Sequence, residues 1–138
     1  MIEHNSQSDE SQKAFKEEKI PEKATGIHRV LRAFLFSRDG FLYMLKEAAF
    51  RQEFLLTLVL GAALFFLDIS LKMKMFMLAS LILVMIVEIL NTGMEIIIDM
   101  ISPGFDLRAK AVKDAGSLAV LMSFIIVAIV WFTGLYIG

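Results

Sequence analysis

Three carboxylates and an amide stand in one line within an otherwise apolar part of the chain. Residues 88–99 read EILNTGMEIIID, and the thirteen residues before them carry no charge. The four polar residues are spaced three, four and four apart: Glu88, Asn91, Glu95 and Asp99. Residues at these spacings share one face of an α-helix. The sequence therefore predicts a polar stripe ~16 Å long on a membrane helix.

The chemistry of this stripe points to a metal and phosphate site. A carboxylate that faces lipid costs a few kcal/mol or more, so the stripe must face other helices, water or a ligand. Carboxylate and amide oxygens are hard ligands that suit Mg²⁺, which usually comes with phosphates. The structural alternative is that Asn91 joins helices while the carboxylates pair with Lys or Arg. Four such residues in register favour a functional site.

Two further charged clusters could meet the stripe. Residues 47–53 read EAAFRQE, in which Glu47 and Arg51 could simply pair across one helical turn. Lys113 is followed by Asp114, and a Lys suits phosphate as a point charge. The ordinary interpretation of Asp114 is a carboxylate that stabilises the start of a helix. Because all three clusters fall on the same side of the membrane, together they predict a metal-dependent site at that interface.

Composition excludes several other kinds of site. The chain has 138 residues, of which 57% are hydrophobic, and a formal net charge of −1 that gives no indication of nucleic-acid binding. It has no cysteine, which excludes disulfides and thiolate metal sites. Neither a P-loop nor a G-x-G-x-x-G nucleotide motif is present. The first residues are polar and acidic, so no cleavable signal peptide is expected.

The N-terminal part of the chain differs from the rest. Residues 1–24 form a polar tail that is too poor in apolar side chains to fold, and we expect it to be disordered. Residues 25–138 form one domain. Within it, residues 26–46 carry apolar side chains at helical spacing and charges on other faces, which predicts an amphipathic helix in the membrane interface. The alternative is a soluble helix packed on a core, and the neighbouring membrane segments favour the interfacial helix. This helix could break near Asp39 and Gly40.

Three membrane helices are expected, at about residues 49–69, 75–101 and 114–137. The uncharged run 54–67 has 14 residues, or roughly 21 Å of helix against a ~30 Å hydrocarbon core, so the first helix must begin within EAAFRQE. Nine Lys or Arg lie at or before Arg51, three in the second loop and two in the first. The positive-inside rule then places the N-terminus and the second loop in the cytoplasm, and the C-terminus outside.

Three segments closely resemble the bacterial integral-membrane diacylglycerol kinase family: EAAFRQE (47–53), VEILNTGMEIIID (87–99) and AKAVKDAGSLAVL (109–121). The resemblance covers roughly residues 25–136. It implies an all-α membrane protein of the bacterial inner membrane, with an N-terminal amphipathic surface helix, three transmembrane helices and a homotrimeric bundle. The implied reaction transfers the γ-phosphoryl group of ATP to the primary hydroxyl of diacylglycerol, giving phosphatidic acid, with Mg²⁺.

The resemblance also implies roles for the stripe and its neighbours. Glu88 matches the position of the family's catalytic base, and Asn91 matches an amide that supports the active-site geometry. Glu47 and Glu95 match the ligands that bridge Mg²⁺ to the ATP phosphates.

Further positions match contacts with the two substrates. Lys113 and Asp114 match a pair that contacts ATP, and Arg29 matches an arginine near nucleotide and lipid. The loop before the last helix, SPGFDLRAK, departs from the Glu-Tyr-His run that a family member has there. Beside Glu88, the residues that match the lipid site are Ala49, Phe50, Arg51, Gln52, Glu53, Ser117, Trp131 and the chain up to residue 136.

Three other functions fit parts of the pattern. A kinase for undecaprenol would share the same site, although the EAAFRQE form favours diacylglycerol. An ion- or proton-conducting oligomer would place Glu88, Glu95 and Asp99 along a path. The stripe occupies only half of one helix, and the last segment offers no polar partner across the bilayer, which disfavours conduction. A non-catalytic scaffold would leave the clustered carboxylates without a purpose.

Overall fold

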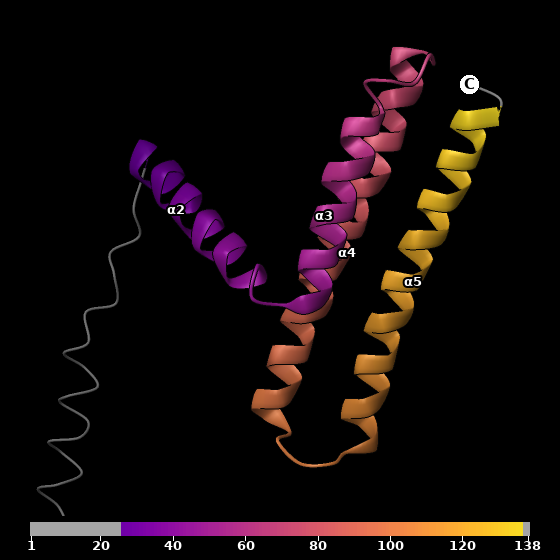
Figure 1. Cartoon of the computed structure of the whole chain (residues 1–138). Helices are drawn as coiled ribbons and strands as arrows, with labels where there is room; N and C mark the ends of the chain where they lie inside the picture. Colours follow the sequence, from indigo (N-terminus) through magenta and orange to yellow (C-terminus); the bar gives the residue numbers. More distant parts are fainter. Residues whose placement is uncertain (1–25, 137–138) are drawn as a thin grey trace, which may run out of the picture. The chain divides into compact units, whose positions relative to one another are not determined.

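A computed structural model describes residues 26–136, and this part of the chain is helical, as the sequence predicts (Figure 1). The expected disordered tail, residues 1–24, lies outside the described residues. The chain divides into two units between Asp39 and Gly40, and the described residues of each unit, 26–39 and 40–136, are treated separately below. The helices are α2 (Ile27–Met44), α3 (Ala48–Ala63), α4 (Leu71–Ile101) and α5 (Leu107–Tyr136).

Helix α2 supplies the expected amphipathic segment. It continues through Asp39 and Gly40, so the break that the Asp-Gly pair suggested does not occur. The helix follows Gly26, whose φ of +62° lies in the left-handed region that favours glycine. The Gly26 carbonyl accepts a hydrogen bond from the Arg29 amide at 3.1 Å. Apolar side chains such as Phe34 are exposed, as expected for a helix that lies against lipid.

Helix α3 is shorter than the sequence led us to expect. It has 16 residues and ends at Ala63 rather than near residue 69, which gives ~24 Å of helix. Among the described residues, only α4 and α5 are long and apolar enough to cross a membrane. Two of the three expected membrane helices are therefore found, and a full crossing by α3 stays a prediction.

Helix α4 begins at Leu71, four residues before the predicted start. The hydroxyl of Ser70 accepts a hydrogen bond from the Met73 amide at 3.3 Å. An N-cap of this kind satisfies an amide that has no partner within the helix. The cap therefore brings Lys72 and Lys74 into the first turn of the helix.

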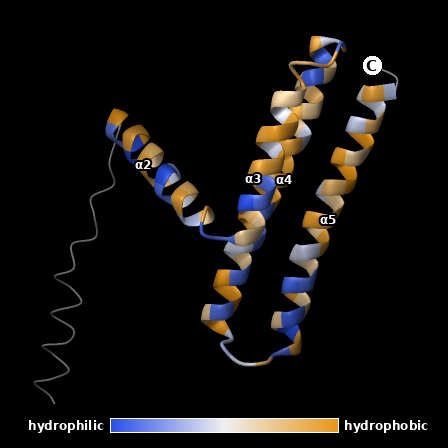
Figure 2. Cartoon of the chain, in the orientation of Figure 1, coloured by the Kyte–Doolittle hydropathy of each residue, from blue (hydrophilic) through white to orange (hydrophobic). Residues whose placement is uncertain are grey.

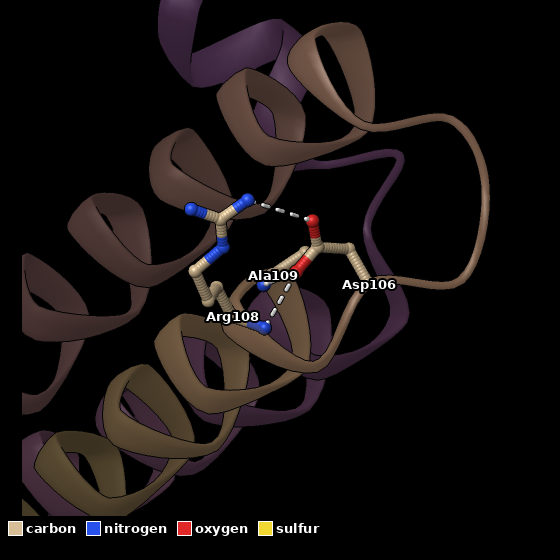
Figure 3. Close-up of polar contacts among 3 residues, drawn as sticks. All are labelled: Asp106, Arg108 and Ala109. Atoms are coloured by element: carbon tan, nitrogen blue, oxygen red, sulfur yellow. Dashed lines mark hydrogen bonds and ion pairs between the residues drawn. The ribbon is translucent and has the colours of Figure 1, made fainter.

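Helix α5 begins at Leu107, seven residues before the predicted start, because Asp106 caps it (Figure 3). One carboxylate oxygen of Asp106 accepts from the amides of Arg108 at 2.7 Å and Ala109 at 3.4 Å. The other lies 3.5 Å from the Arg108 guanidinium. The predicted span, about 114–137, covered the membrane-crossing part, and the cap lets the charged residues before it become helical as well.

Helix α4 packs against both α3 and α5, and the three helices run in alternating directions (Figure 1). Its buried apolar residues are Met77, Leu81 and Val84, spaced four and three apart on one face. The buried residues of α5 are small: Gly116, Ser123 and Gly134. Small residues let helix backbones approach closely within a membrane.

Hydropathy changes along this helix bundle. Most of α4 and α5 is apolar, and hydrophilic residues gather where these helices approach their connecting loop and where α3 begins (Figure 2). We call the end of the bundle nearest this connecting loop the polar end, because it holds the stripe. The opposite end carries the charged residues Asp68, Lys72 and Lys74.

Candidate active site

A cleft of about 300 Å³ lies at the polar end of the bundle, where α3 begins beside α4 and α5. Helix α4 contributes most of its polar groups. The loop before α3 and the first half of α5 complete it. Its lining residues are Glu47, Ala49, Glu88, Asn91, Thr92, Glu95, Ser117 and Val120. The structure thus brings the EAAFRQE segment and the polar stripe together, although they are far apart in the sequence.

The stripe is most buried at its first residues. Glu88 is 5% exposed and Asn91 is 7% exposed, whereas Asp99 is open to the surface. The Asn91 amide nitrogen donates a hydrogen bond to a carboxylate oxygen of Glu95 at 3.2 Å. This bond orients Glu95 and leaves its second oxygen available to a ligand.

The other end of the Asn91 amide packs against α5. Its oxygen is buried without a hydrogen-bond partner. A Cβ on Gly116 would overlap this oxygen, so a larger residue at position 116 would displace the amide. Gly116 therefore sets the place of Asn91, and through Asn91 that of Glu95.

Glu47 occupies the N-cap position of α3, but its side chain makes no capping hydrogen bond. The alternative pairing with Arg51 is absent from the part of the chain that the structure describes. Arg51 instead donates to the backbone oxygens of Lys46 at 2.8 Å and Leu45 at 3.4 Å. The Arg51 guanidinium thus holds the connection between α2 and α3, and the Glu47 carboxylate is left to line the cleft.

Lys113 and Asp114 lie in a second cleft of about 370 Å³, at the end of α4 and the start of α5. The Lys113 ammonium is 2.5 Å from a carboxylate oxygen of Asp99. The Lys110 ammonium is 2.5 Å from a carboxylate oxygen of Asp114. Glu95 lines the first cleft, and Asp99, one helical turn later, lines the second. The two clefts are therefore neighbours along α4.

The residues expected to line the lipid site are dispersed. Ala49 and Ser117 line the first cleft. Phe50 is 1% exposed and stacks on Phe54 with ring centroids 6.2 Å apart, so it packs in the core instead of facing a ligand. Arg51 and Gln52 are exposed.

Glu53 and Trp131 lie farther from the polar end. Glu53 is buried in a small cavity with Leu81 and Val84, and one of its oxygens has no hydrogen-bond partner. The Trp131 indole donates to the Met77 carbonyl at 3.4 Å, which joins α5 to α4 in the apolar half. Arg29 lies on α2 in the N-terminal unit, and its place near a substrate stays a prediction.

Sequence reasoning missed three residues of the site. Thr92 is buried, lines the cleft and follows Glu88 by four residues, a spacing that could have revealed it. Gly116 sits inside a helix, where glycine is unfavourable and therefore usually has a packing reason. Val120 also lines the cleft, but a valine in an apolar helix gives no indication of this in the sequence.

The donor set of the first cleft fits a magnesium ion that is shared with a phosphate ligand. No three acidic or histidine side chains among the described residues are arranged to hold a metal ion between them. Glu47 and Glu95 nevertheless line the same cleft, and both offer the hard oxygens that Mg²⁺ prefers. Because Mg²⁺ in proteins usually keeps several waters and binds substrate phosphates, two carboxylates suffice.

Comparison with known proteins agrees with this arrangement. Residues 35–135 match the family model for prokaryotic diacylglycerol kinase. The chain belongs to the prokaryotic diacylglycerol kinase family. Membership makes it a lipid kinase, and its long apolar helices make this kinase a membrane protein.

Relatives of this kinase come from several bacteria. The chain is 38% identical over 110 residues to a diacylglycerol kinase of Pseudomonas aeruginosa, covering 79% of this chain and 89% of that protein. It is 36% identical over 108 residues to the diacylglycerol kinase of Escherichia coli K12, covering 78% and 88%. The diacylglycerol kinase of Haemophilus influenzae is 34% identical over 110 residues, covering 79% and 93%.

Proposed function

We propose that this kinase transfers the γ-phosphoryl group of ATP to the primary hydroxyl of diacylglycerol and releases phosphatidic acid and ADP. The observation that carries the proposal is the single cleft that Glu47, Glu88, Asn91 and Glu95 line at the polar end of an apolar bundle. A lipid hydroxyl lies near the headgroup level, and ATP arrives from the cytoplasm. A site at that boundary lets the two substrates meet without moving the lipid into water.

Glu88 is the general base of this reaction. Among the described residues it has no ion-pair partner, so its carboxylate is available to accept the proton of the lipid hydroxyl. The hydroxyl oxygen then forms a bond to the γ-phosphorus, and the bond from that phosphorus to the oxygen bridging it to the β-phosphorus breaks. ADP leaves with the electron pair of that bond. Little covalent chemistry is required of the protein, so positioning dominates.

Glu47 and Glu95 would hold magnesium together with the ATP phosphates. When bound, the ion neutralises charge on the phosphates. Asn91 contributes by holding Glu95 in place through its hydrogen bond. Lys113 and Asp114, in the adjoining cleft, contact ATP, and Arg29 contacts the nucleotide or the lipid.

The lipid approaches the first cleft beside Ala49 and Ser117, which line it. Arg51 and Gln52, which are exposed, extend this lipid-facing segment, whereas Glu53 lies buried between the helices. Phe50 and Trp131 contribute by packing the helices that carry the site.

The working unit is a homotrimer in the bacterial inner membrane, with the N-terminus in the cytoplasm. Many large apolar side chains of α4 and α5 are exposed in the single chain, among them Ile86, Ile97 and Ile126. Lipid and neighbouring subunits would cover these side chains. Chemical crosslinking in native membranes should give a band of three subunits, and a monomer alone would contradict the trimer.

Radiolabelled ATP and two lipid alcohols test the proposed function. The purified protein, in mixed micelles with Mg²⁺, should label diacylglycerol far faster than undecaprenol, and removal of Mg²⁺ should stop the labelling. Faster labelling of undecaprenol would replace the proposed substrate with a polyisoprenoid alcohol. ATP consumption without any labelled lipid would instead favour an ion- or proton-conducting oligomer.

A further inference from the structure

An ion pair joins α4 to α5 in the second cleft. The Lys113 ammonium lies 2.5 Å from a carboxylate oxygen of Asp99, and this is the single ion pair between two helices in the part of the chain that the structure describes. The neighbouring pair, Lys110 with Asp114, lies within one turn of α5. The Lys113 side chain therefore pairs with a carboxylate of α4, whereas the Asp114 side chain pairs with a lysine of its own helix.

Stability does not explain this pair. The Lys113 and Asp99 side chains are 37% and 63% exposed, and exposed ion pairs contribute little to stability because water screens them. Asp99 also lies in the last turn of α4, which ends at Ile101. A carboxylate is unfavourable there because the C-terminal end of a helix carries partial negative charge. An aspartate at position 99 therefore lowers the stability of α4, and its ion pair with Lys113 restores little of it. This indicates that Asp99 serves the second cleft rather than the fold.

Asp99 restricts a side chain that would otherwise be mobile. The lysine ammonium sits on a flexible four-carbon stem and loses conformational entropy when it is held in one place. It has three N–H donors, of which Asp99 takes one and leaves two for other acceptors. Asp99 also follows Glu95 by one turn, or about 6 Å along the helix, so the held ammonium lies near the end of α4 that carries Glu95.

We propose that Asp99 is a positioning residue that holds the Lys113 ammonium ready for the phosphates of ATP. This inference rests on the proposed function, because it takes Lys113 as an ATP contact. Asp99 itself touches no substrate in this arrangement. It pre-orders Lys113 before the nucleotide arrives, so that less entropy is lost when the nucleotide binds.

Substitutions at position 99 test the role through steady-state kinetics. Asp99→Asn keeps the shape but removes the charge, and it should raise the KM for Mg·ATP about tenfold, the effect expected when one charge-assisted hydrogen bond is lost. The kcat should change less than about threefold because the reacting atoms are untouched. Asp99→Glu keeps the carboxylate and should recover most of the KM. Arg108→Gln removes another exposed ion pair near the start of α5 and serves as the matched control, with both constants unchanged.

A double-mutant cycle decides whether Asp99 acts through Lys113. Lys113→Gln alone should raise the KM for Mg·ATP, and adding Asp99→Asn to that variant should have no further effect. Additive losses would overturn the inference, because Asp99 would then contact the nucleotide or metal by itself. Loss of the folded trimer on Asp99→Asn would also overturn it and assign the pair to the fold. If the wild-type chain labels no lipid, the proposed function itself fails. That outcome is distinct from additive losses in the double-mutant cycle, which would contradict only the role of Asp99.

Discussion

One face of α4 carries buried apolar side chains in its first half and polar side chains in its second half. In the first half it carries Met77, Leu81 and Val84, which are all buried. In the second half the same spacing continues with Glu88, Asn91 and Glu95, which line the cleft. Because the helix geometry is the same in both halves, the change of side-chain chemistry distinguishes the packing surface from the candidate site.

The packing around α4 also differs between the halves. Helix α3 begins at Ala48, and α4 runs past this start toward its loop (Figure 1). Within residues 40–136, the first half of α4 therefore packs against two helices, and the end of the second half packs against α5 alone. Asp99 lies in this uncovered end and is exposed, whereas Glu88 and Asn91 are buried beside the start of α3.

Glu88→Gln tests the polar half with the largest expected effect. Glutamine keeps the size of the side chain but cannot accept the hydroxyl proton, so kcat should fall by about 10²- to 10⁴-fold. Lipid phosphorylation at saturating substrates measures this. The matched control is Ser80→Ala, because Ser80 is also 5% exposed, lies on α4 and bonds only to the Met77 carbonyl of its own helix. Equal losses in both variants, or loss of folding, would mean that Glu88 is structural.

Glu95→Gln should affect the use of magnesium more than the chemical step. Loss of one charged ligand should raise the Mg²⁺ concentration for half-maximal activity by about tenfold. A magnesium titration at fixed ATP measures the shift. Asp68→Asn provides the control, since Asp68 is an exposed carboxylate before the other end of α4. An unchanged magnesium requirement would exclude Glu95 from the metal site.

Two glycines of α5, Gly116 and Gly134, contact the polar half and the apolar half of α4, so the same change to alanine can be made against each half. Gly116→Ala would displace the Asn91 amide and, through it, Glu95, so kcat/KM should fall about tenfold. In Gly134→Ala the new Cβ would lie 2.6 Å from the Met77 sulfur, and the flexible Met side chain can yield.

Gly134→Ala should therefore lower stability by about 1–3 kcal/mol, as overpacking does, and leave kcat/KM unchanged. Kinetics and thermal unfolding of both variants in micelles separate the two effects. Similar kinetic losses in both would remove the distinction between a packing half and a catalytic half.

Asp106→Ala should have the smallest effect. It removes the cap of α5 shown in Figure 3, which should cost about 1 kcal/mol of stability. Thermal unfolding measures this cost. Arg108→Gln removes only the 94%-exposed partner of Asp106 and should have almost no effect on stability. Equal destabilisation by both variants would show that the ion pair, and not the cap, starts the helix.

The sequence predicted the helical fold and much of the first cleft. Glu88, Asn91 and Glu95 follow from their spacing, since residues of one helix that share a face must lie together. Glu47 followed from its place at the polar end of a membrane segment. The prediction did not find Gly116, because its importance comes from the Asn91 side chain of another helix.

The sequence by itself determined what depends on neighbours along the chain: which segments are helical, which are apolar enough for a membrane, and which face of α4 is polar. Only the tertiary structure decided which side chains meet. It placed Lys113 on Asp99, Arg51 on backbone carbonyls and Phe50 in the core. The physical reason is that contacts between helices depend on how each helix is rotated and shifted along its axis. Spacing within one helix does not fix either quantity.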